Sequence, residues 1–337
     1  MYLTNEKVAV LGAAGAIGSN LVQSLLQTGT ANRISMYDPL EGPLKGSAEE
    51  IYHCSFPGAQ VTWTIDEAEA LADAAYIITA GGAPRRAGMT REDLRKDNCK
   101  IARNLGQQIK RHCPACKLAV VIFNPADITG LTTLVHSGLP GSAVSTLAAL
   151  DSTRLQSALA QHFSVAQDQV TGCATYGGHG EQMAVFKGSI SVAGTPLGEI
   201  LDGATVEGQG LTPGQWTDLQ QQVRGGGAAI IKLRGRSSFQ SPAHLSTSML
   251  RGRLGADEFP WPCGTYVNRG EFRHIMMAMD TRFGPDGLEY SMPEGDAADM
   301  AALRNSYKHL ANLRDQTIAD GLLPPLDEWK DVNPNLV

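Results

Sequence analysis

The sequence lacks a hydrophobic segment that could cross a bilayer, because no apolar run approaches the roughly 20 residues that a transmembrane helix needs. Residues 1–7 also lack the charged and then apolar pattern of a secretory signal peptide. We therefore expect a cytoplasmic protein that does not bind membranes.

Positive charge is not in excess either, since 28 Lys and Arg residues stand against 34 Asp and Glu residues, for a net charge of −6. Proteins that bind nucleic acids or anionic membranes usually carry an overall basic field. We expect neither as a partner, so any anion-binding site must be local.

Cysteine is scarce as well, and six in 337 residues are too few for a disulfide framework. Cys113-Pro114-Ala115-Cys116 fits the redox motif C-x-x-C, but it follows a predicted helix and precedes a strand instead of opening a helix. We interpret it as two reduced structural thiols, with a redox pair as the alternative. No cluster of His, Cys and Asp has the spacing of metal ligands, so we expect no metal site.

Residues 7–38 have the pattern of one strand-helix-strand unit. The continuous apolar run 8–11 is typical of a strand buried on both faces of a parallel sheet. A glycine-rich turn, a helix over 19–27 and a second strand over 34–37 follow, and the second strand ends at Asp38.

The glycines of this turn suit a dinucleotide. Gly12 makes the tight change of direction, Gly15 lets the backbone approach a pyrophosphate, and Gly18 lets helix and strand pack closely. Asp38 can accept hydrogen bonds from ribose hydroxyls and would repel the 2′-phosphate of NADP. The unit predicts a site for NAD, with a plain glycine-rich turn as the alternative.

Strands and helices continue to alternate up to residue 146. Further strands are predicted at 61–64, 75–80, 117–123 and 143–146, and helices at 45–54, 66–72 and 91–111. This alternation predicts an α/β fold with a Rossmann-type, doubly wound parallel sheet, in which ligands bind at the carboxyl ends of the strands. Gly12, Asp38, the segment 81–91 and Asn124 all follow predicted strands, so we expect them to meet in one cleft.

From residue 150 the pattern changes to that of an α+β domain. Helices are predicted from 150 and at 213–224, 227–233 and 296–320, and strands at 172–176, 189–192, 266–267, 275–279 and from 282, with a turn at 284–287. We place an NAD-binding domain at 1–149 and an α+β catalytic domain that binds the substrate at 150–337. The tail after residue 321 shows no periodicity and should pack on the surface or on a partner subunit.

The segment 81–94 concentrates positive charge. It carries Arg85, Arg86 and Arg91 among glycines, which suits a loop that closes over an anion. A solvated basic turn is the alternative.

Two further polar features stand in the second half. Asp151 and Arg154 are three residues apart and share a helix face, either as a ligand-binding pair or as an ordinary salt bridge within the helix. His179 stands among Gly177, Gly178 and Gly180, where a ligand could come close. A structural or merely exposed histidine is the alternative.

The order and spacing of these motifs resemble the lactate/malate dehydrogenase family over nearly the whole chain. The matching segments are Gly12-Ala13-Ala14-Gly15-Ala16-Ile17-Gly18, Asp38, Arg85 to Arg91 with Asn98, Asn124-Pro125, Leu150-Asp151-x-x-Arg154, Gly178-His179-Gly180 and Ile231-Lys232-Leu233-Arg234-Gly235-x-Ser237-Ser238. The resemblance implies an NAD-dependent 2-hydroxy acid dehydrogenase that assembles as a homodimer or homotetramer. The segment 252–274 and the tail match the family pattern only loosely, and the arginine loop is one residue longer than in the commonest bacterial malate-type members.

The resemblance also implies a role for each matching side chain. His179 would exchange a proton with the C2 oxygen of the substrate, and Asp151 would hold its imidazole and raise its pKa. Arg154 would bind the C1 carboxylate, and Arg91 would polarise the C2 carbonyl. Asn124 would bind the substrate or the nicotinamide ribose.

Arg85 would select the substrate. Malate-type members carry arginine at this position to pair with the second carboxylate of oxaloacetate, whereas lactate-type members carry an uncharged residue. Ser237 would line the substrate side of the pocket, and the neighbouring Arg86 has no implied role. The implied reaction is reversible hydride transfer between malate or oxaloacetate and NAD, a step of the tricarboxylic acid cycle.

The cofactor contacts follow from the same resemblance. NAD would be bound by Gly12, Gly15, Ala16, Ile17, Gly18, Asp38, Asn98, Ile122 and Asn124. Two alternatives stay open: a dehydrogenase for another 2-hydroxy acid, such as a lactate-like one, and a catalytically idle NAD-binding protein.

Overall fold

The computed structural model describes residues 1–83 and 91–336, except for the side chain of Arg91. Arg85, which the resemblance assigns to substrate selection, and its neighbour Arg86 therefore lie outside the described residues. Arg91 is described only as the first residue of a helix.

The first half of the chain forms a parallel sheet of six strands. These are β1 (Val8–Leu11), β2 (Arg33–Tyr37), β3 (Gln60–Thr64), β4 (Tyr76–Thr79), β5 (Leu118–Val121) and β6 (Val144–Thr146), in the order β3-β2-β1-β4-β5-β6. Every residue of β1, β4 and β5 is buried, which explains their continuous apolar sequences. The predicted Rossmann-type, doubly wound sheet is confirmed.

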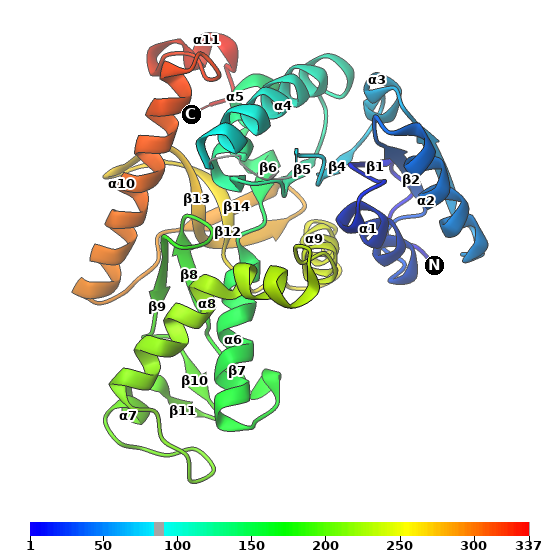
Figure 1. Cartoon of the computed structure of the whole chain (residues 1–337). Coiled ribbons are helices and arrows are strands. Elements are labelled where there is room, and N and C mark those ends of the chain that lie inside the picture. The colour runs from blue at the N-terminus through cyan, green and yellow to red at the C-terminus, as the bar shows by residue number, and fades with distance from the viewer. Residues whose placement is uncertain (84–90, 337) are drawn as a thin grey trace.

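Helices cover both faces of this sheet (Figure 1). They are α1 (Ala16–Gln27), α2 (Glu41–His53), α3 (Glu67–Leu71), α4 (Arg91–His112) and α5 (Ala126–Ser137), followed by the short 3-10 turn η1 (Gly141–Ala143). Val8 and Val10 pack in one core cluster with residues of α1 and α2, whereas Ala9 and Leu11 pack in a second cluster with residues of α4 and α5. The alternation of side chains along β1 thus serves two cores.

The sheet continues into the second half of the chain as antiparallel strands. These are β12 (Cys263–Arg269), β13 (Phe272–Gly284), β14 (Gly287–Ser291), β8 (Ala174–Gly177) and β9 (Met183–Phe186). β12 joins the parallel part where Gly264 pairs with Thr146 of β6. A Cβ atom on Gly264 would lie 1.8 Å from Thr146 Oγ1, so only glycine fits at this junction.

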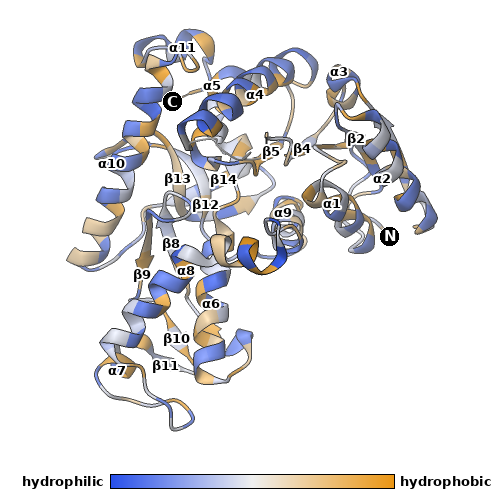
Figure 2. Ribbon diagram, viewed as in Figure 1, coloured by the Kyte–Doolittle hydropathy of each residue, from blue (hydrophilic) through white to orange (hydrophobic). Residues whose placement is uncertain are grey.

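The remaining elements also belong to the second half of the chain. The helices are α6 (Ala149–Phe163), α7 (Leu197–Leu201), α8 (Pro213–Arg234), α9 (Gln240–Arg253), α10 (Ala297–Ala319) and α11 (Trp329–Val332), with short 3-10 turns η2 (Gln167–Gln169) and η3 (Leu326–Glu328). A small second sheet has the order β11 (Thr195–Pro196), β10 (Ser191–Val192), β7 (Val170–Thr171). Hydrophilic and hydrophobic residues are mixed along α4 and α10 (Figure 2), as expected of helices that bury only one side.

Several elements differ from the sequence-based prediction. α8 is one helix through 225–227, where three glycines predicted a break, and α5, α9 and β9 were not predicted. All residues of α5 except His136 are buried, so the sequence of this helix carries no amphipathic stripe. Tertiary burial, not local propensity, stabilises it.

The C-terminal tail packs against its own chain. Asn333 is fully buried, and its Nδ2 donates hydrogen bonds to the carbonyl oxygens of Leu134 (2.8 Å) and Leu139 (2.9 Å), at the end of α5 and just beyond it. Trp329 is buried in the core cluster beneath α4 and α5. Within the described ranges, no helix is both long and apolar enough to pass through a bilayer.

Candidate active site

The turn between β1 and α1 is built so that its backbone lies open. Gly12 has a φ of 79°, and a Cβ atom on it would lie 2.7 Å from Gly81 Cα. A Cβ atom on Gly18 would lie 2.2 Å from the carbonyl oxygen of Gly12. Because both positions exclude a side chain, the turn presents main-chain groups to whatever binds there.

The first turn of α1 offers unused hydrogen-bond donors. Among the described residues, the backbone N–H groups of Ala16, Ile17 and Gly18 have no acceptor. Such groups at a helix N-terminus stabilise an anion, helped by the helix dipole. Gly15 is the N-cap residue and contributes no side chain to the space above the turn.

Asp38 is fixed beside this turn at the end of β2. Its carboxylate accepts hydrogen bonds from the backbone N–H groups of Ala14 (3.3 Å) and Leu40 (3.1 Å), and the residue is 8% exposed. An open glycine turn with free N–H donors and a fixed acidic side chain one strand away fits the two ends of an adenosine diphosphate group.

A pocket of about 190 Å³ lies over the glycine turn. One wall is the turn itself, and another is the connection between α8 and α9, which includes Ser237. The structure therefore places Ser237 opposite the glycine turn, in the same pocket as Gly12, Gly15, Ala16, Ile17 and Gly18.

Asn98 of α4 links two loops at the carboxyl ends of the strands. Its Oδ1 accepts a hydrogen bond from Ala83 N (2.7 Å), and its Nδ2 donates to the carbonyl oxygens of Ala83 (3.3 Å) and Asn124 (2.6 Å). Since its amide is engaged by the chain itself, Asn98 positions the backbone of Asn124. Ile122 lies just beyond β5 and is largely buried.

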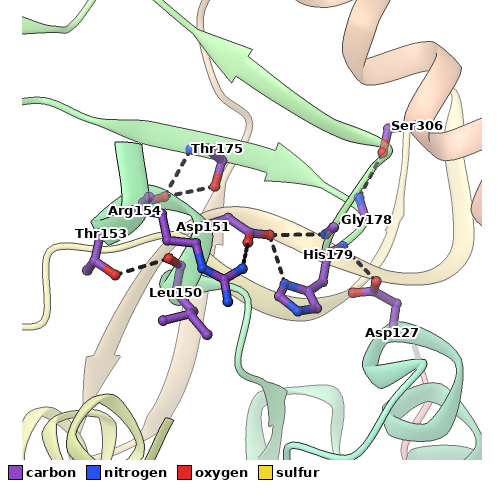
Figure 3. A network of polar contacts seen from close by, with 11 residues as sticks. Asp127, Leu150, Asp151, Thr153, Arg154, Thr175, Gly178, His179 and Ser306 are labelled. Carbon is purple, nitrogen blue, oxygen red and sulfur yellow. Dashed lines mark hydrogen bonds and ion pairs between the residues drawn. The ribbon is translucent and has the colours of Figure 1, made fainter. Parts of the chain in front are cut away.

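His179, Asp151 and Arg154 are brought together from two segments (Figure 3). His179 follows β8, and Asp151 and Arg154 lie in α6. Asp151 Oδ2 lies 2.8 Å from His179 Nδ1, and Asp151 Oδ1 accepts a hydrogen bond from Arg154 Nη1 at 3.0 Å. The Asp151 side chain is 1% exposed, whereas those of Arg154 and His179 are 17% and 19% exposed.

This arrangement determines the protonation of the pair. The charge of Asp151 and its hydrogen bond raise the pKa of His179, against the opposing effect of burial. Burial disfavours ionised Asp151, but the nearby His179 and Arg154 outweigh it and keep the pKa of Asp151 below its usual value. With Nδ1 turned to the carboxylate, Nε2 is left to exchange a proton, and no described group bonds to it.

A second carboxylate holds the main chain of His179. Asp127, in the first turn of α5, accepts a hydrogen bond from His179 N through Oδ2 (2.9 Å), and the residue is 4% exposed. Burial raises the pKa of Asp127 to about 6. Its Oδ1 is buried and has no partner among the described residues. Asp127 was not predicted as a site residue from the sequence.

Other groups rigidify the same loop and helix. Ser306 Oγ of α10 accepts a hydrogen bond from Gly178 N at 2.8 Å. Arg154 lies against α8, where a Cβ atom on Gly226 would stand 3.2 Å from Arg154 Cδ. This close approach accounts for glycine in the middle of a long helix.

The cysteine motif takes no part in this site. Cys113 and Cys116 are buried and not disulfide-bonded, and burial raises the pKa of the Cys113 thiol to about 12. This agrees with two reduced structural thiols. Within residues 1–83 and 91–336, no group of three or more His, Cys, Asp or Glu side chains could hold a metal ion.

Family models match nearly the whole chain. Residues 6–146 match the NAD-binding domain of lactate/malate dehydrogenase, and residues 148–317 match its alpha/beta C-terminal domain. The chain belongs to the lactate/malate dehydrogenase family. It is therefore an oxidoreductase of this family whose cofactor is NAD, and the glycine turn with Asp38 fits that cofactor.

Individual relatives of both types are similar to the chain. The malate dehydrogenase of Pelagibacter ubique (strain HTCC1062) is 30% identical over 290 residues, covering 84% of this chain and 88% of the relative. The crystal structure of Cryptosporidium parvum malate dehydrogenase has a TM-score of 0.84 at 25% identity, covering 94% of this chain and 100% of that one. The C. parvum lactate dehydrogenase complexed with lactic acid and β-nicotinamide adenine dinucleotide has the same TM-score and identity, with coverage of 93% and 98%.

The structure gathers the expected site residues of this family member into two groups. Gly12, Gly15, Ala16, Ile17 and Gly18 line one pocket with Ser237, and Asp38 is hydrogen-bonded to the same turn. Asp151, Arg154 and His179 form the side-chain cluster. Asn98, Ile122 and Asn124 lie at the carboxyl end of β5 or are bonded to it. The arginines at 85 and 86 and the side chain of Arg91 lie outside the described residues.

Proposed function

We propose that this family member is a malate dehydrogenase, which interconverts malate and oxaloacetate with NAD. The observation that carries the chemistry is the 2.8 Å contact of His179 Nδ1 with buried Asp151, beside Arg154. The sequence supports the choice of a dicarboxylate, because Arg85 stands six residues before Arg91. Relatives named malate dehydrogenase, 28–30% identical over most of the chain, support the same choice.

When bound, oxidised NAD would accept a hydride from the C2 carbon of malate, and NADH would return it to the C2 carbon of oxaloacetate. In malate oxidation, His179 Nε2 takes the proton of the C2 hydroxyl, and Asp151 stabilises the imidazolium that forms. Arg154 pairs with the C1 carboxylate through two parallel hydrogen bonds. In the reverse direction, the imidazolium returns the proton to the C2 oxygen.

The remaining proposed contacts select and polarise the substrate. Arg91 stabilises the charge that builds on the C2 oxygen, and Arg85 pairs with the second carboxylate of oxaloacetate. Asn124 donates a hydrogen bond to the substrate or to the nicotinamide ribose. Ser237 is small and leaves room for a dicarboxylate.

A panel of 2-oxo acids, assayed with NADH and with NADPH, tests the proposal. We expect oxaloacetate with NADH to be the best pair. Arg85→Gln should reduce the oxaloacetate/pyruvate ratio of kcat/KM by tens of times or more, because a charge left unpaired in a closed site costs about 2–5 kcal/mol. A 2-oxo acid without a second carboxylate as the clear best substrate, or an unchanged ratio in Arg85→Gln, would contradict the malate assignment.

A second candidate is a dehydrogenase for a monocarboxylic 2-hydroxy acid. The equal TM-score of 0.84 with the malate and lactate dehydrogenases of C. parvum favours neither type. The same panel separates the candidates. Tight NADH binding without turnover of any 2-oxo acid would instead indicate an idle NAD-binding protein.

Assembly as a homodimer or homotetramer is also part of the proposal, and it rests on family membership. Light scattering of the purified chain measures it, and a monomer at micromolar concentration would contradict it. A cytoplasmic location and a place in the tricarboxylic acid cycle stay predictions from the sequence.

A further inference from the structure

A cationic residue from the second half of the chain borders the same pocket as the glycine turn. Arg236 lies in the connection between α8 and α9 and lines the pocket of about 190 Å³ over the turn, together with Ser237, Ser238 and Phe239.

Arg236 is held by a ring but not by a carboxylate. Its guanidinium carbon lies 4.5 Å from the centroid of the Phe239 ring, and Phe239 is only 9% exposed. Cation–π contact of this kind directs a guanidinium without neutralising it. Among the described residues, Arg236 has no ion pair and no side-chain hydrogen bond, and the residue is exposed, so its donors are available to a ligand.

Arg234 provides an internal comparison. Its guanidinium carbon also lies 4.5 Å from the Phe239 centroid, but its Nη1 donates to Gln240 Oε1 at 3.2 Å, and it does not line the pocket. Two arginines therefore contact one ring, and only Arg236 lines the pocket. The pocket, rather than the ring, distinguishes Arg236.

The wall formed by the glycine turn is already suited to an anion. Among the described residues, the N–H groups of Ala16, Ile17 and Gly18 have no acceptor, and the positive end of the α1 dipole adds to their effect. An arginine and three N–H groups that border one pocket of this size match a group with two adjacent negative charges. A planar fork of donors binds phosphate oxygens in pairs.

We propose that Arg236 binds the pyrophosphate of NAD from the side opposite the glycine turn. The cofactor site then includes a charged group from beyond residue 149, and the connection between α8 and α9 contributes to cofactor affinity. This assignment rests on the NAD site and not on which 2-hydroxy acid is the substrate.

The test compares Arg236→Leu with the matched variant Arg234→Leu by titrating protein fluorescence with NADH. Since a hydrogen-bonded charge on a partly exposed site contributes on the order of a tenfold change in affinity, we expect Arg236→Leu to raise the Kd for NADH about tenfold. Arg234→Leu should leave the Kd unchanged. The dependence of Kd on salt should also become weaker in Arg236→Leu alone.

Competition with fragments separates a phosphate contact from general damage. ADP, which carries the two phosphates, should lose affinity in Arg236→Leu, whereas adenosine, which has none, should bind as in the wild type. Arg236→Lys should recover part of the loss, because it restores the charge without the fork. Equal Kd values for NADH in both leucine variants, or a parallel loss for ADP and adenosine, would overturn the proposal.

Discussion

The two parts of the candidate site are made in different ways. The glycine turn, Gly12 to Gly18, offers main-chain N–H groups from one short segment. The cluster around His179 consists of side chains from three distant segments, including Asp127 and Asp151, and each is held by a hydrogen bond. Backbone groups do not titrate, so the turn should be insensitive to pH and sensitive to any added Cβ. The cluster is made of titratable side chains, so its function should depend on pH.

Replacing His179 by Asn should give the largest effect. The side chain would no longer exchange a proton, so kcat/KM should fall on the order of 10³-fold, whereas the Kd for NADH should stay close to that of the wild type. Steady-state rates and NADH titration measure the two quantities. A large loss of NADH affinity would show that the cluster and the turn do not act separately.

Gly18→Ala should damage the other part. The added Cβ would lie 2.2 Å from the Gly12 carbonyl oxygen, so the turn must shift. We expect NADH binding to weaken by more than about tenfold and the free energy of unfolding to fall by about 1–3 kcal/mol. Gly42→Ala, where nothing lies within 4 Å of the new Cβ, is the control: it should leave NADH binding unchanged and should not lower the free energy of unfolding. Unaltered NADH binding in Gly18→Ala would refute the close packing at this turn.

Asp127→Asn should change the pH dependence of catalysis. Ionised Asp127 raises the pKa of His179, together with the larger effect of Asp151 and against the charge of Arg154. In the variant the pKa of His179 should fall, so the acidic limb of the pH profile for malate oxidation should move to lower pH. An acidic limb that stays in place would assign Asp127 a purely structural role.

Asp127 also predicts a pH effect on stability. Its pKa is raised by burial to about 6 in the folded chain, from an ordinary value of 3.8, so the folded state binds this proton more tightly than the unfolded state. The resulting stabilisation is present below about pH 4 and is lost as the pH rises to about 6, at most about 3 kcal/mol. Denaturant unfolding between pH 4 and 7 measures this effect. The free energy of unfolding of the wild type should fall over this range by more than that of Asp127→Asn, which has no carboxyl group to ionise at this position.

The smallest predicted effect concerns the glycines of α8. Gly225→Ala meets nothing within 4 Å and should stabilise the helix by up to about 1 kcal/mol without changing KM. Gly226→Ala should gain the same helical propensity but press on Arg154 Cδ, 3.2 Å away, and raise KM for the substrate a few-fold. Equal KM values in the two variants would show that Arg154 tolerates the displacement.

The sequence predicted the parts whose signals are local. The strand at 8–11, its glycine turn and Asp38 are contiguous or nearly so, and their pattern was sufficient. The pairing of His179 with Asp151 was expected from the family resemblance, and the structure supplies the contact. Asp127 was missed because its function depends on a hydrogen bond across 52 positions in the chain. The long helix α8 was predicted as two helices because three successive glycines lie in its interior, and no local pattern records the packing of Gly226 against Arg154.

The junction of Gly264 with Thr146 has a consequence for how the molecule can move. Thr146 lies five residues before Asp151, and β8, which leads to His179, is bonded to β13, the neighbour of β12. One continuous sheet therefore connects the two residues whose side chains meet at 2.8 Å. The two halves of the chain cannot rotate relative to each other as rigid domains without twisting this sheet. The sheet thus fixes the distance between His179 and Asp151. Movements that accompany ligand binding should occur in the segments that border the sheet.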